Sequence, residues 1–169
     1  MKIGVIKENQ KSEKRIAISP NISKLLIEKG FEILIEEDAG LASLYKNSDY
    51  ESVGAKVTNR VTLFKESTVL IKINPFDEDD LTMVNNTHIL MSQLYHKSNA
   101  ELLKAIASTG ATAFSMDAMP RISRAQDMDV LSSQNNLAGY KAVIVGAYEM
   151  TKIFPLMMTA AGTIVPSKV

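Results

Sequence analysis

Short apolar runs alternate with segments of helical spacing along the first two thirds of the chain. Five runs are apolar enough to form buried strands, and they occupy residues 2–6, 32–36, 69–73, 88–91 and 112–115. Between them, apolar residues recur at intervals of three and four, which is the spacing of one helix face. Strands that alternate with helices usually connect in parallel. The pattern therefore predicts an α/β domain built on a parallel sheet.

Capping residues mark the ends of two of the predicted helices. Ser19, followed by a proline, predicts a helix start, and Gly30 predicts the end of that helix before the second strand. Ser98 and Glu101 have the spacing of a capping box, and Gly110 ends the helix that precedes the fifth strand. These signals support a repeated strand-helix unit.

The pattern changes after residue 120, where a polar stretch precedes a long helix that begins at Leu131. Apolar side chains recur along that helix at helical spacing: Leu137, Tyr140, Ile144, Ala147 and Tyr148. The tail, residues 159–169, contains a glycine and a proline and predicts a loop or linker. The chain is thus expected to form an α/β domain at residues 1–130 and a connecting helix with linker at residues 131–169.

Composition and charge exclude several classes of protein. The 169 residues are 46% apolar, which is enough for a real core, and 19 basic side chains are balanced by 19 acidic ones. This balance argues against nucleic acid as a partner. There is no cysteine, so disulfides and thiolate chemistry are excluded. Polar residues interrupt both the N-terminus and the most apolar stretch, residues 142–165, so neither a signal peptide nor direct membrane insertion is expected.

The densest group of hydrogen-bonding side chains lies in residues 120–140, which read PRISRAQDMDVLSSQNNLAGY. Such a segment has two interpretations. It can be an N-capped helix with a solvated first turn, because Asp and Ser favour those positions. It can also be a ligand site, because Arg, Gln and Asp together offer a donor fork, an amide and an acceptor. Composition alone leaves both open.

The run RISRAQ, the following DVLSSQNNLAGY and the later AYEM and MMTAAGTI resemble the NAD(H)-binding component of the proton-translocating NAD(P) transhydrogenase family. The similarity extends over essentially the whole chain. It implies a Rossmann- or flavodoxin-like, three-layer domain of the type shared with alanine dehydrogenases. Carried over by motif, the family's nicotinamide contacts are expected at Arg121, Gln126, Asp129 and Ser132.

The resemblance also implies a reaction and a set of partners. In that family a hydride passes from NADH to NADP⁺, which is held on a partner domain, while a membrane-spanning component moves protons. The cofactor performs the bond chemistry, so alignment is the protein's task. The expected protein is a homodimer, cytoplasmic and peripheral to the inner membrane through its partner subunits.

A second interpretation is an alanine dehydrogenase-like enzyme. The related alanine dehydrogenases carry an Arg and a Lys at the motifs that hold Arg15 (EKRIAISP) and Lys72 (VLIKINP), where they bind and polarise a keto acid. Alternatively, Arg15 anchors a loop and Lys72 extends from a strand end. The position of the dehydrogenases' catalytic histidine is occupied by Tyr95, and His96 is one residue late. Adjacent residues face different ways, so this departure argues against keto acid reduction.

Other candidates are weaker. His88 and His96 lack the spacing and supporting carboxylates of a metal pair, so no metal site is predicted. The acidic run at residues 77–80 predicts a solvated turn and a helix start. A third functional class is a non-catalytic dimerisation or docking module that uses the long helix as its contact surface.

A dinucleotide fold needs a glycine-rich turn at which backbone amides bind the pyrophosphate. The sequence contains no G-x-G-x-x-G run. In the resembled family that loop follows the equivalent of IVPSKV, residues 164–169. The chain by itself is therefore expected to hold nicotinamide-side groups, to lack most of the affinity for NAD(H), and to be inactive.

Overall fold

A six-stranded parallel sheet forms the centre of the first of two units into which the chain divides, Met1–Met128 and Asp129–Val169. The computed structural model describes residues 1–9 and 11–168. The sheet has the order β3-β2-β1-β4-β5-β6. Its strands are β1 (Lys2–Val5), β2 (Glu32–Glu36), β3 (Lys56–Thr58), β4 (Val69–Ile71), β5 (Ile89–Ser92) and β6 (Thr112–Ser115). The predicted parallel α/β architecture is confirmed.

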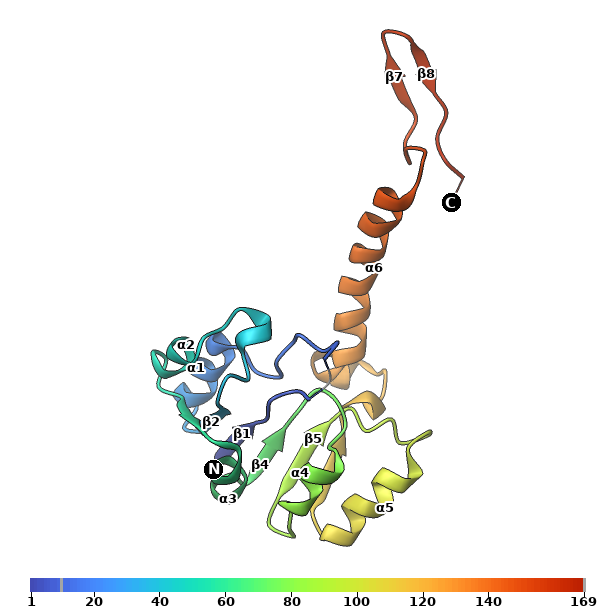
Figure 1. Cartoon of the computed structure of the whole chain (residues 1–169). Coiled ribbons are helices and arrows are strands. Elements are labelled where there is room, and N and C mark those ends of the chain that lie inside the picture. The colour runs from blue at the N-terminus through green and yellow to red at the C-terminus, as the bar shows by residue number, and fades with distance from the viewer. Residues whose placement is uncertain (10, 169) are drawn as a thin grey trace. The chain divides into compact units, whose positions relative to one another are not determined.

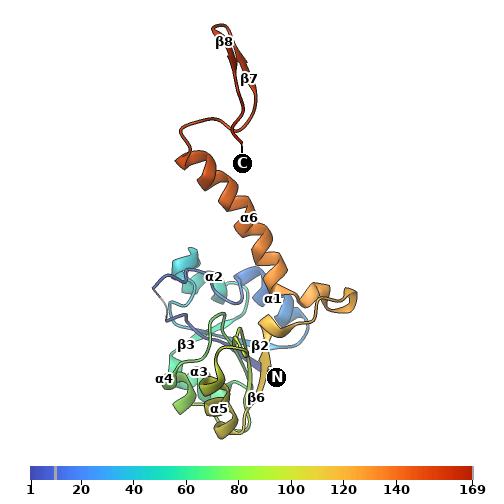
Figure 2. The ribbon, with the colours of Figure 1, turned by 90° about the vertical axis from the view of Figure 1, so that its right-hand side faces the viewer.

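Helices cover both faces of the sheet and give the first unit three layers (Figures 1 and 2). One face carries α1 (Pro20–Glu28) and α2 (Asn47–Glu51). The other carries α3 (Arg60–Glu66), α4 (Glu78–Thr82) and α5 (Ala100–Thr109). Three 3₁₀ turns complete the unit: η1 (Leu41–Ser43), η2 (Met116–Ala118) and η3 (Ser123–Met128).

The strands supply two cores because successive side chains point to opposite faces. In β2, Ile33 and Ile35 pack on the face of α1 and α2, whereas Leu34 packs on the face of α3 to α5. In the same way, Val69 and Leu70 of β4 divide between the two cores. Burial on both faces explains why the strands read as continuous apolar runs rather than as alternating ones.

The predicted strands differ from the observed ones mainly by one addition. All five expected strands are present, although the fourth begins one residue later, at Ile89. The sixth, β3, was not predicted. It is only three residues long, its burial is partial, and its pairing with β2 places it at the sheet edge. A single apolar residue, Val57, gave too little signal for a strand.

One of the two predicted helix starts is correct. The Ser19 side chain caps α1 by accepting a hydrogen bond from the Ile22 N–H, at 3.4 Å. The capping box expected at the start of α5 is wrong. That helix begins one residue later, with Asn99 as its N-cap residue, and the Ser98 hydroxyl instead donates to the Tyr95 carbonyl, at 3.2 Å.

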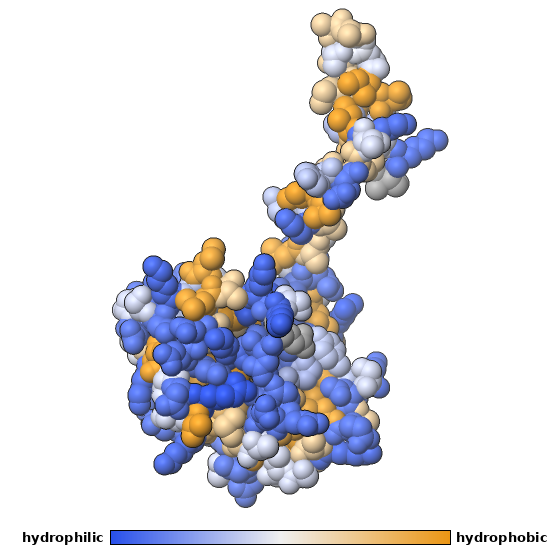
Figure 3. Space-filling model, in the orientation of Figure 1, coloured by the Kyte–Doolittle hydropathy of each residue, from blue (hydrophilic) through white to orange (hydrophobic). Residues whose placement is uncertain are grey.

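The second unit contains α6 (Val130–Glu149) and an antiparallel hairpin of β7 (Met157–Thr159) and β8 (Gly162–Ile164). The tail was expected to be a loop, and the hairpin corrects that expectation for residues 159–164. Gly162 has a φ of 126°, which only glycine adopts without strain, so the glycine that predicted a loop in fact serves a tight reversal. Apolar side chains lie on the surface of this unit (Figure 3).

Candidate functional site

The carboxyl ends of β1 and β4 form the point at which the chain changes sides of the sheet. The connection after β1 leads to α1 on one face, and the connection after β4 leads to α4 on the other. In open parallel sheets such a change leaves a crevice beyond the strand ends, where ligands bind. The residues that follow β1 and β4 are therefore the first place to look for chemistry.

Four side chains form a continuous hydrogen-bonded chain across this crevice. The Arg15 guanidinium donates to both oxygens of Glu13, with Nε at 2.8 Å and Nη2 at 2.6 Å. The Asn74 amide nitrogen, which follows β4, donates to Glu13 at 3.3 Å and to Glu8 at 2.9 Å. Glu8 also accepts from the backbone N–H of Ile73, at 2.6 Å. The loops after β1 and β4 are thus joined by side chains.

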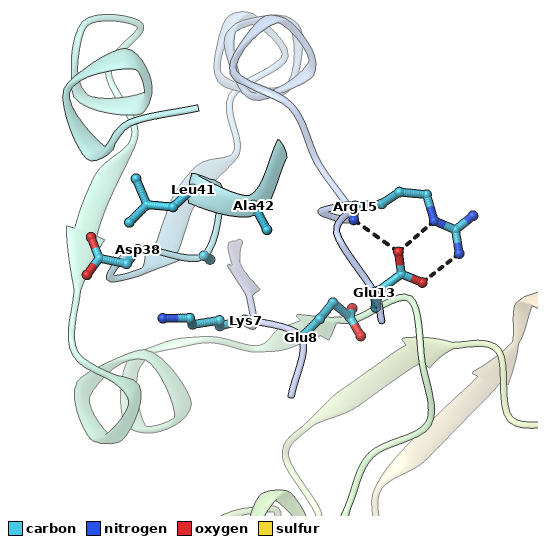
Figure 4. Close-up of a pocket in the computed structure, with 8 residues that line it drawn as sticks. Lys7, Glu8, Glu13, Arg15, Asp38, Leu41 and Ala42 are labelled. Atoms are coloured by element: carbon cyan, nitrogen blue, oxygen red, sulfur yellow. Dashed lines mark hydrogen bonds and ion pairs between the residues drawn. The ribbon is translucent and has the colours of Figure 1, made fainter. Parts of the chain in front are cut away.

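A hollow of about 210 Å³ lies at the carboxyl ends of β1 and β2. Arg15 and Glu13 form one wall and Lys7, Asp38 and Leu41 another, as Figure 4 shows. Hydrogen bonding to Arg15 lowers the pKa of Glu13 to about 2. Hydrogen bonding to Glu13 likewise raises the pKa of Arg15. The hollow is therefore lined by charged groups that are already partly satisfied by one another.

Lys72 does not face that hollow but lies in a buried ion network. Its ammonium donates to Asp80 at 2.8 Å, and the two side chains are 2% and 0% exposed. Arg60 contacts the other oxygen of Asp80 and pairs with Glu36 at 3.0 Å. Glu36 in turn accepts from the backbone N–H of Lys7, at 2.8 Å. Opposite charges and hydrogen bonds compensate the burial of each group.

The acidic run at residues 77–80 does start a helix, as predicted, but its last residue is not solvated. Asp77 is the N-cap of α4, and its side chain accepts from the Asp80 N–H at 2.8 Å. Asp80, one helical turn on, faces the interior and meets Lys72 and Arg60. A carboxylate can be buried here because two cations surround it, which the local sequence does not reveal.

The polar segment after β6 leaves two of the predicted contacts accessible. Arg121 precedes η3 and Gln126 lies within it, and both are exposed. Within residues 1–9 and 11–168, neither side chain has a hydrogen bond or ion pair. Ala125, which is 3% exposed, packs into the unit between them. The guanidinium fork and the amide are thus available to a ligand.

The other two predicted contacts are engaged with each other at the start of α6. Asp129 is the N-cap residue, and one of its oxygens accepts from the Ser132 N–H at 2.9 Å. The Ser132 hydroxyl donates to the other oxygen at 2.6 Å. The capping interpretation of this segment is therefore realised in these two residues. It does not exclude ligand binding, since both side chains lie at a helix N-terminus, where anions and polar groups bind.

The histidines have structural surroundings. His88 is 3% exposed, its Nδ1 accepts from the Asn85 N–H at 3.0 Å, and its Nε2 donates to the Phe64 carbonyl at 2.9 Å. His96 is exposed and lies 3.8 Å from Asp117. Among the residues that the structure describes, no group of three potential ligands could hold a metal ion.

Sequence reasoning missed most of the polar network at this edge. Glu8, Glu13 and Asn74 were not singled out, although Glu8 and Asn74 each lie within three residues of a strand end. Parallel strands end at one edge, so polar residues directly after predicted strands are the signal that could have found them. Arg60 and Glu36 gave no such signal, because they meet only through tertiary packing.

The strand order and the polar strand ends define a Rossmann-like α/β domain with a ligand-binding edge. Residues 4–138 match the family model described as "Alanine dehydrogenase/PNT, N-terminal domain", and the chain belongs to this family. No helix within the described residues is long and apolar enough to cross a membrane.

Individual relatives agree with this assignment. The chain is 40% identical to the first of the proteins that make up the NAD(P) transhydrogenase alpha subunit of Rhodospirillum rubrum, over 100% of this chain and 46% of the relative. It is 27% identical to alanine dehydrogenase 1 of Staphylococcus aureus, over 88% of this chain and 39% of that protein. The structure superposes on the transhydrogenase of Sinorhizobium meliloti with a TM-score of 0.91 and 38% identity, covering 98% of this chain and 50% of that one. The chain thus spans about half the length of these relatives.

Proposed function

We propose that this chain is part of the NAD(H)-binding component of a proton-translocating NAD(P) transhydrogenase. In this role, hydride passes from NADH to NADP⁺ on a partner component, and the transfer is coupled to proton movement through a membrane-spanning component. The observation that carries the proposal is the 40% identity to a transhydrogenase alpha subunit along 100% of the chain. The exposed, unengaged side chains of Arg121 and Gln126 are consistent with it.

The chemistry asked of the protein in this proposal is alignment. NADH supplies the hydride when it is bound, so no protein acid or base is needed. Arg121 and Gln126 would hydrogen-bond the nicotinamide carboxamide or neighbouring oxygens, because a guanidinium donates and an amide both donates and accepts. Asp129 and Ser132 would contribute an acceptor and a hydroxyl from the start of α6. Holding one face of the ring in place reduces the orientational cost of transfer.

The alternative of keto acid reduction is less well supported. It requires the Lys72 ammonium to reach a substrate carbonyl, whereas this ammonium is bound to Asp80 and the side chain is 2% exposed. Tyr95 stands where the dehydrogenases were expected to have a catalytic histidine, and its hydroxyl donates to Gln93 at 2.8 Å. Arg15 remains in the hollow, where its pairing with Glu13 supports a role in anchoring the loop.

The proposed partners follow from the same assignment. An NADP(H)-binding component and a membrane-spanning component would complete the enzyme and hold this chain at the cytoplasmic side of the inner membrane. A second copy of the chain would cover α6, whose apolar side chains are exposed: Leu137, Tyr140, Ile144 and Tyr148. Because the sequence has no G-x-G-x-x-G run, we expect the chain alone to bind NADH weakly and to be inactive.

Substitution of Arg121 or Gln126 by alanine in the complete transhydrogenase tests the proposal. Each change should slow hydride transfer at saturating NADH by about tenfold or more, which corresponds to about 1.4 kcal/mol of transition-state stabilisation. The measurement is the single-turnover rate of transfer from NADH to an NADP⁺ analogue. Arg124→Ala is the matched control, because Arg124 is an exposed arginine in the same 3₁₀ turn.

Equal rates in Arg121→Ala, Gln126→Ala and the control would contradict the assignment of these contacts. A separate assay of the complete protein with NADH, pyruvate and ammonia distinguishes the alternative enzyme. Turnover of pyruvate that is lost in Arg15→Ala would favour the dehydrogenase, whereas the transhydrogenase proposal predicts no turnover.

A further inference from the structure

Asp117 joins the polar segment that contains Arg121 and Gln126 to the loop after β5. It lies in η2, directly after β6 and four residues before Arg121. One of its oxygens, Oδ1, accepts three hydrogen bonds: from the Leu94 N–H at 2.8 Å, the Tyr95 N–H at 3.3 Å and the Ser115 hydroxyl at 2.7 Å. The side chain is 11% exposed. It is therefore a nearly buried acceptor shared by two elements.

The two backbone donors form a small anion-binding concavity. Successive N–H groups converge on one acceptor when adjacent residues have φ angles of opposite sign. Tyr95 supplies the unusual angle, with a φ of 51° in the left-handed region that disfavours bulky side chains. Such a conformation persists where surrounding contacts impose it. Asp117 supplies that contact, so the loop geometry and the carboxylate depend on each other.

The segment that follows has few other attachments. Between Met119 and Met128 only Ala125 is buried, and the hydrogen bonds given for its backbone join near neighbours. Within the described part of residues 116–128, Asp117 is the residue whose side chain hydrogen-bonds another element. The segment is thus fixed by Asp117 at its start and by Ala125 in its middle, with Arg121 between these two points.

We propose that Asp117 is a positioning residue for the Arg121–Gln126 segment, and that it acts by binding the backbone amides of Leu94 and Tyr95. The proposal rests on the function proposed above only for its kinetic consequence. Without the carboxylate, Tyr95 has no acceptor to hold its left-handed conformation and the start of the segment is released. Arg121 then samples positions in which its guanidinium cannot orient a bound nicotinamide.

The hydrogen-bond pattern allows a sharp choice of variants. All three donors bind one oxygen, so Asp117→Asn can keep all three bonds through its carbonyl oxygen, whereas Asp117→Ala loses them. Ser115→Ala removes one donor and leaves the two amide bonds in place, which provides a milder variant if Asp117→Ala fails to fold. Asp79→Ala is the control, because Asp79 is exposed in α4 and its side chain has no hydrogen bond within the described residues.

The first measurement is amide hydrogen exchange of this chain and needs no activity. Asp117→Ala should raise exchange at least fivefold in peptides that cover residues 93–97 and 119–128, and leave β1 and β4 unchanged. Asp117→Asn and Asp79→Ala should match the wild type, and Ser115→Ala should lie between. Unchanged exchange at 119–128 in folded Asp117→Ala, or in Ser115→Ala if the alanine variant does not fold, overturns the proposal.

The second measurement is hydride transfer in the complete transhydrogenase. Asp117→Ala should lower the rate at saturating NADH by about tenfold while KM for NADH changes less than about threefold, because alignment is lost rather than affinity. Asp117→Asn should restore the rate. The double variant with Arg121→Ala should be no slower than Arg121→Ala alone, since Asp117 acts through that residue.

These outcomes separate the two proposals. Additive losses in the double variant contradict action through Arg121 and overturn the positioning role. If exchange changes as expected but neither Asp117→Ala nor Arg121→Ala affects hydride transfer, the positioning contact stands and the proposed function fails.

Discussion

Glu13 shows how strongly one neighbour can change a side chain at the candidate site. Its carboxylate receives two hydrogen bonds from the Arg15 side chain and one from Asn74. A charge-assisted, bidentate pair of this kind is among the stronger polar contacts in proteins. Arg15 itself is half-exposed, with 48% of its side chain accessible, so solvent weakens the pair's net contribution.

The lowered pKa of Glu13 makes stability depend on acid pH. The pKa falls from 4.5 in the unfolded chain to about 2 in the folded one, so the folded state favours the ionised form. This contribution is fully present above about pH 4.5 and is lost as the pH falls towards about 2. We expect Glu13→Gln to remove about 1–2 kcal/mol at pH 7, and to lose correspondingly less than the wild type between pH 5 and 2.

Urea unfolding at a series of pH values measures this difference. Other carboxylates with lowered pKa values, including Asp77 and Asp117, titrate in both proteins, so the informative quantity is the wild-type curve minus the variant curve. A difference that stays constant from pH 5 to pH 2 would show that Glu13 does not titrate as the structure implies.

At the scale of elements, α6 differs from the helices of the first unit. All of its 20 residues lie outside the buried class, whereas α1 to α5 each bury at least one residue. A helix of this length gains most of its stability in proteins from packing an apolar face. Its cap, Asp129, satisfies the first-turn amide of Ser132 but adds only about 1 kcal/mol. The exposed apolar residues therefore call for a partner surface.

The proposed homodimer gives a direct prediction for α6. Leu137, Tyr140, Ile144 and Tyr148 follow one another at intervals of three and four and form a single stripe. Sedimentation equilibrium at micromolar concentration should report twice the chain mass of 18.6 kDa. Ile144→Glu should weaken association at least tenfold, because a carboxylate cannot be buried unpaired in such an interface.

Asn135→Glu provides the control, because Asn135 is exposed on the opposite side of α6 from that stripe. It adds the same charge and should leave the dimer unchanged. A monomeric wild-type chain, or equal weakening by both variants, would count against α6 as the contact surface.

At the scale of the whole first unit, the buried ion network ties together elements that are distant in sequence. Lys72 follows β4, Asp80 belongs to α4, Arg60 begins α3 and Glu36 ends β2. These contacts hold the carboxyl edge of the sheet on which the candidate site is built. Removing one member leaves the others buried without full compensation, which is more costly than removing a pair.

A double-mutant cycle measures this coupling. Lys72→Met should lower the free energy of unfolding by about 3 kcal/mol, and Asp80→Asn by a similar amount. The double variant should be at least about 2 kcal/mol more stable than the sum of the single losses. Lys104 and Glu101 form the comparison pair: their separation is 2.9 Å, but their side chains are 74% and 87% exposed.

The exposed pair should show a coupling of no more than a few tenths of a kcal/mol. Burial, rather than distance, would then explain the contrast. Strict additivity for Lys72 and Asp80 would contradict the network as described.

The sequence by itself determined the class of fold. Continuous apolar runs at five strands, helical spacing between them and the Ser19 cap are local signals, and they led to the correct parallel α/β domain. Motifs such as RISRAQ also led to the correct family. Local signals were insufficient where an element is short, as for β3, or where a neighbouring residue takes over the cap, as Asn99 does at α5.

Only the tertiary structure decided which charged groups are available for chemistry. Lys72 and Asp80 lie eight residues apart, and nothing in that spacing shows that they bury one another while Arg60 joins them. Arg121, in contrast, is exposed and unengaged among the residues described. The physical reason is that the burial of a charge depends on long-range contacts with opposite charges, whereas strands and helices follow from the periodicity of neighbouring side chains.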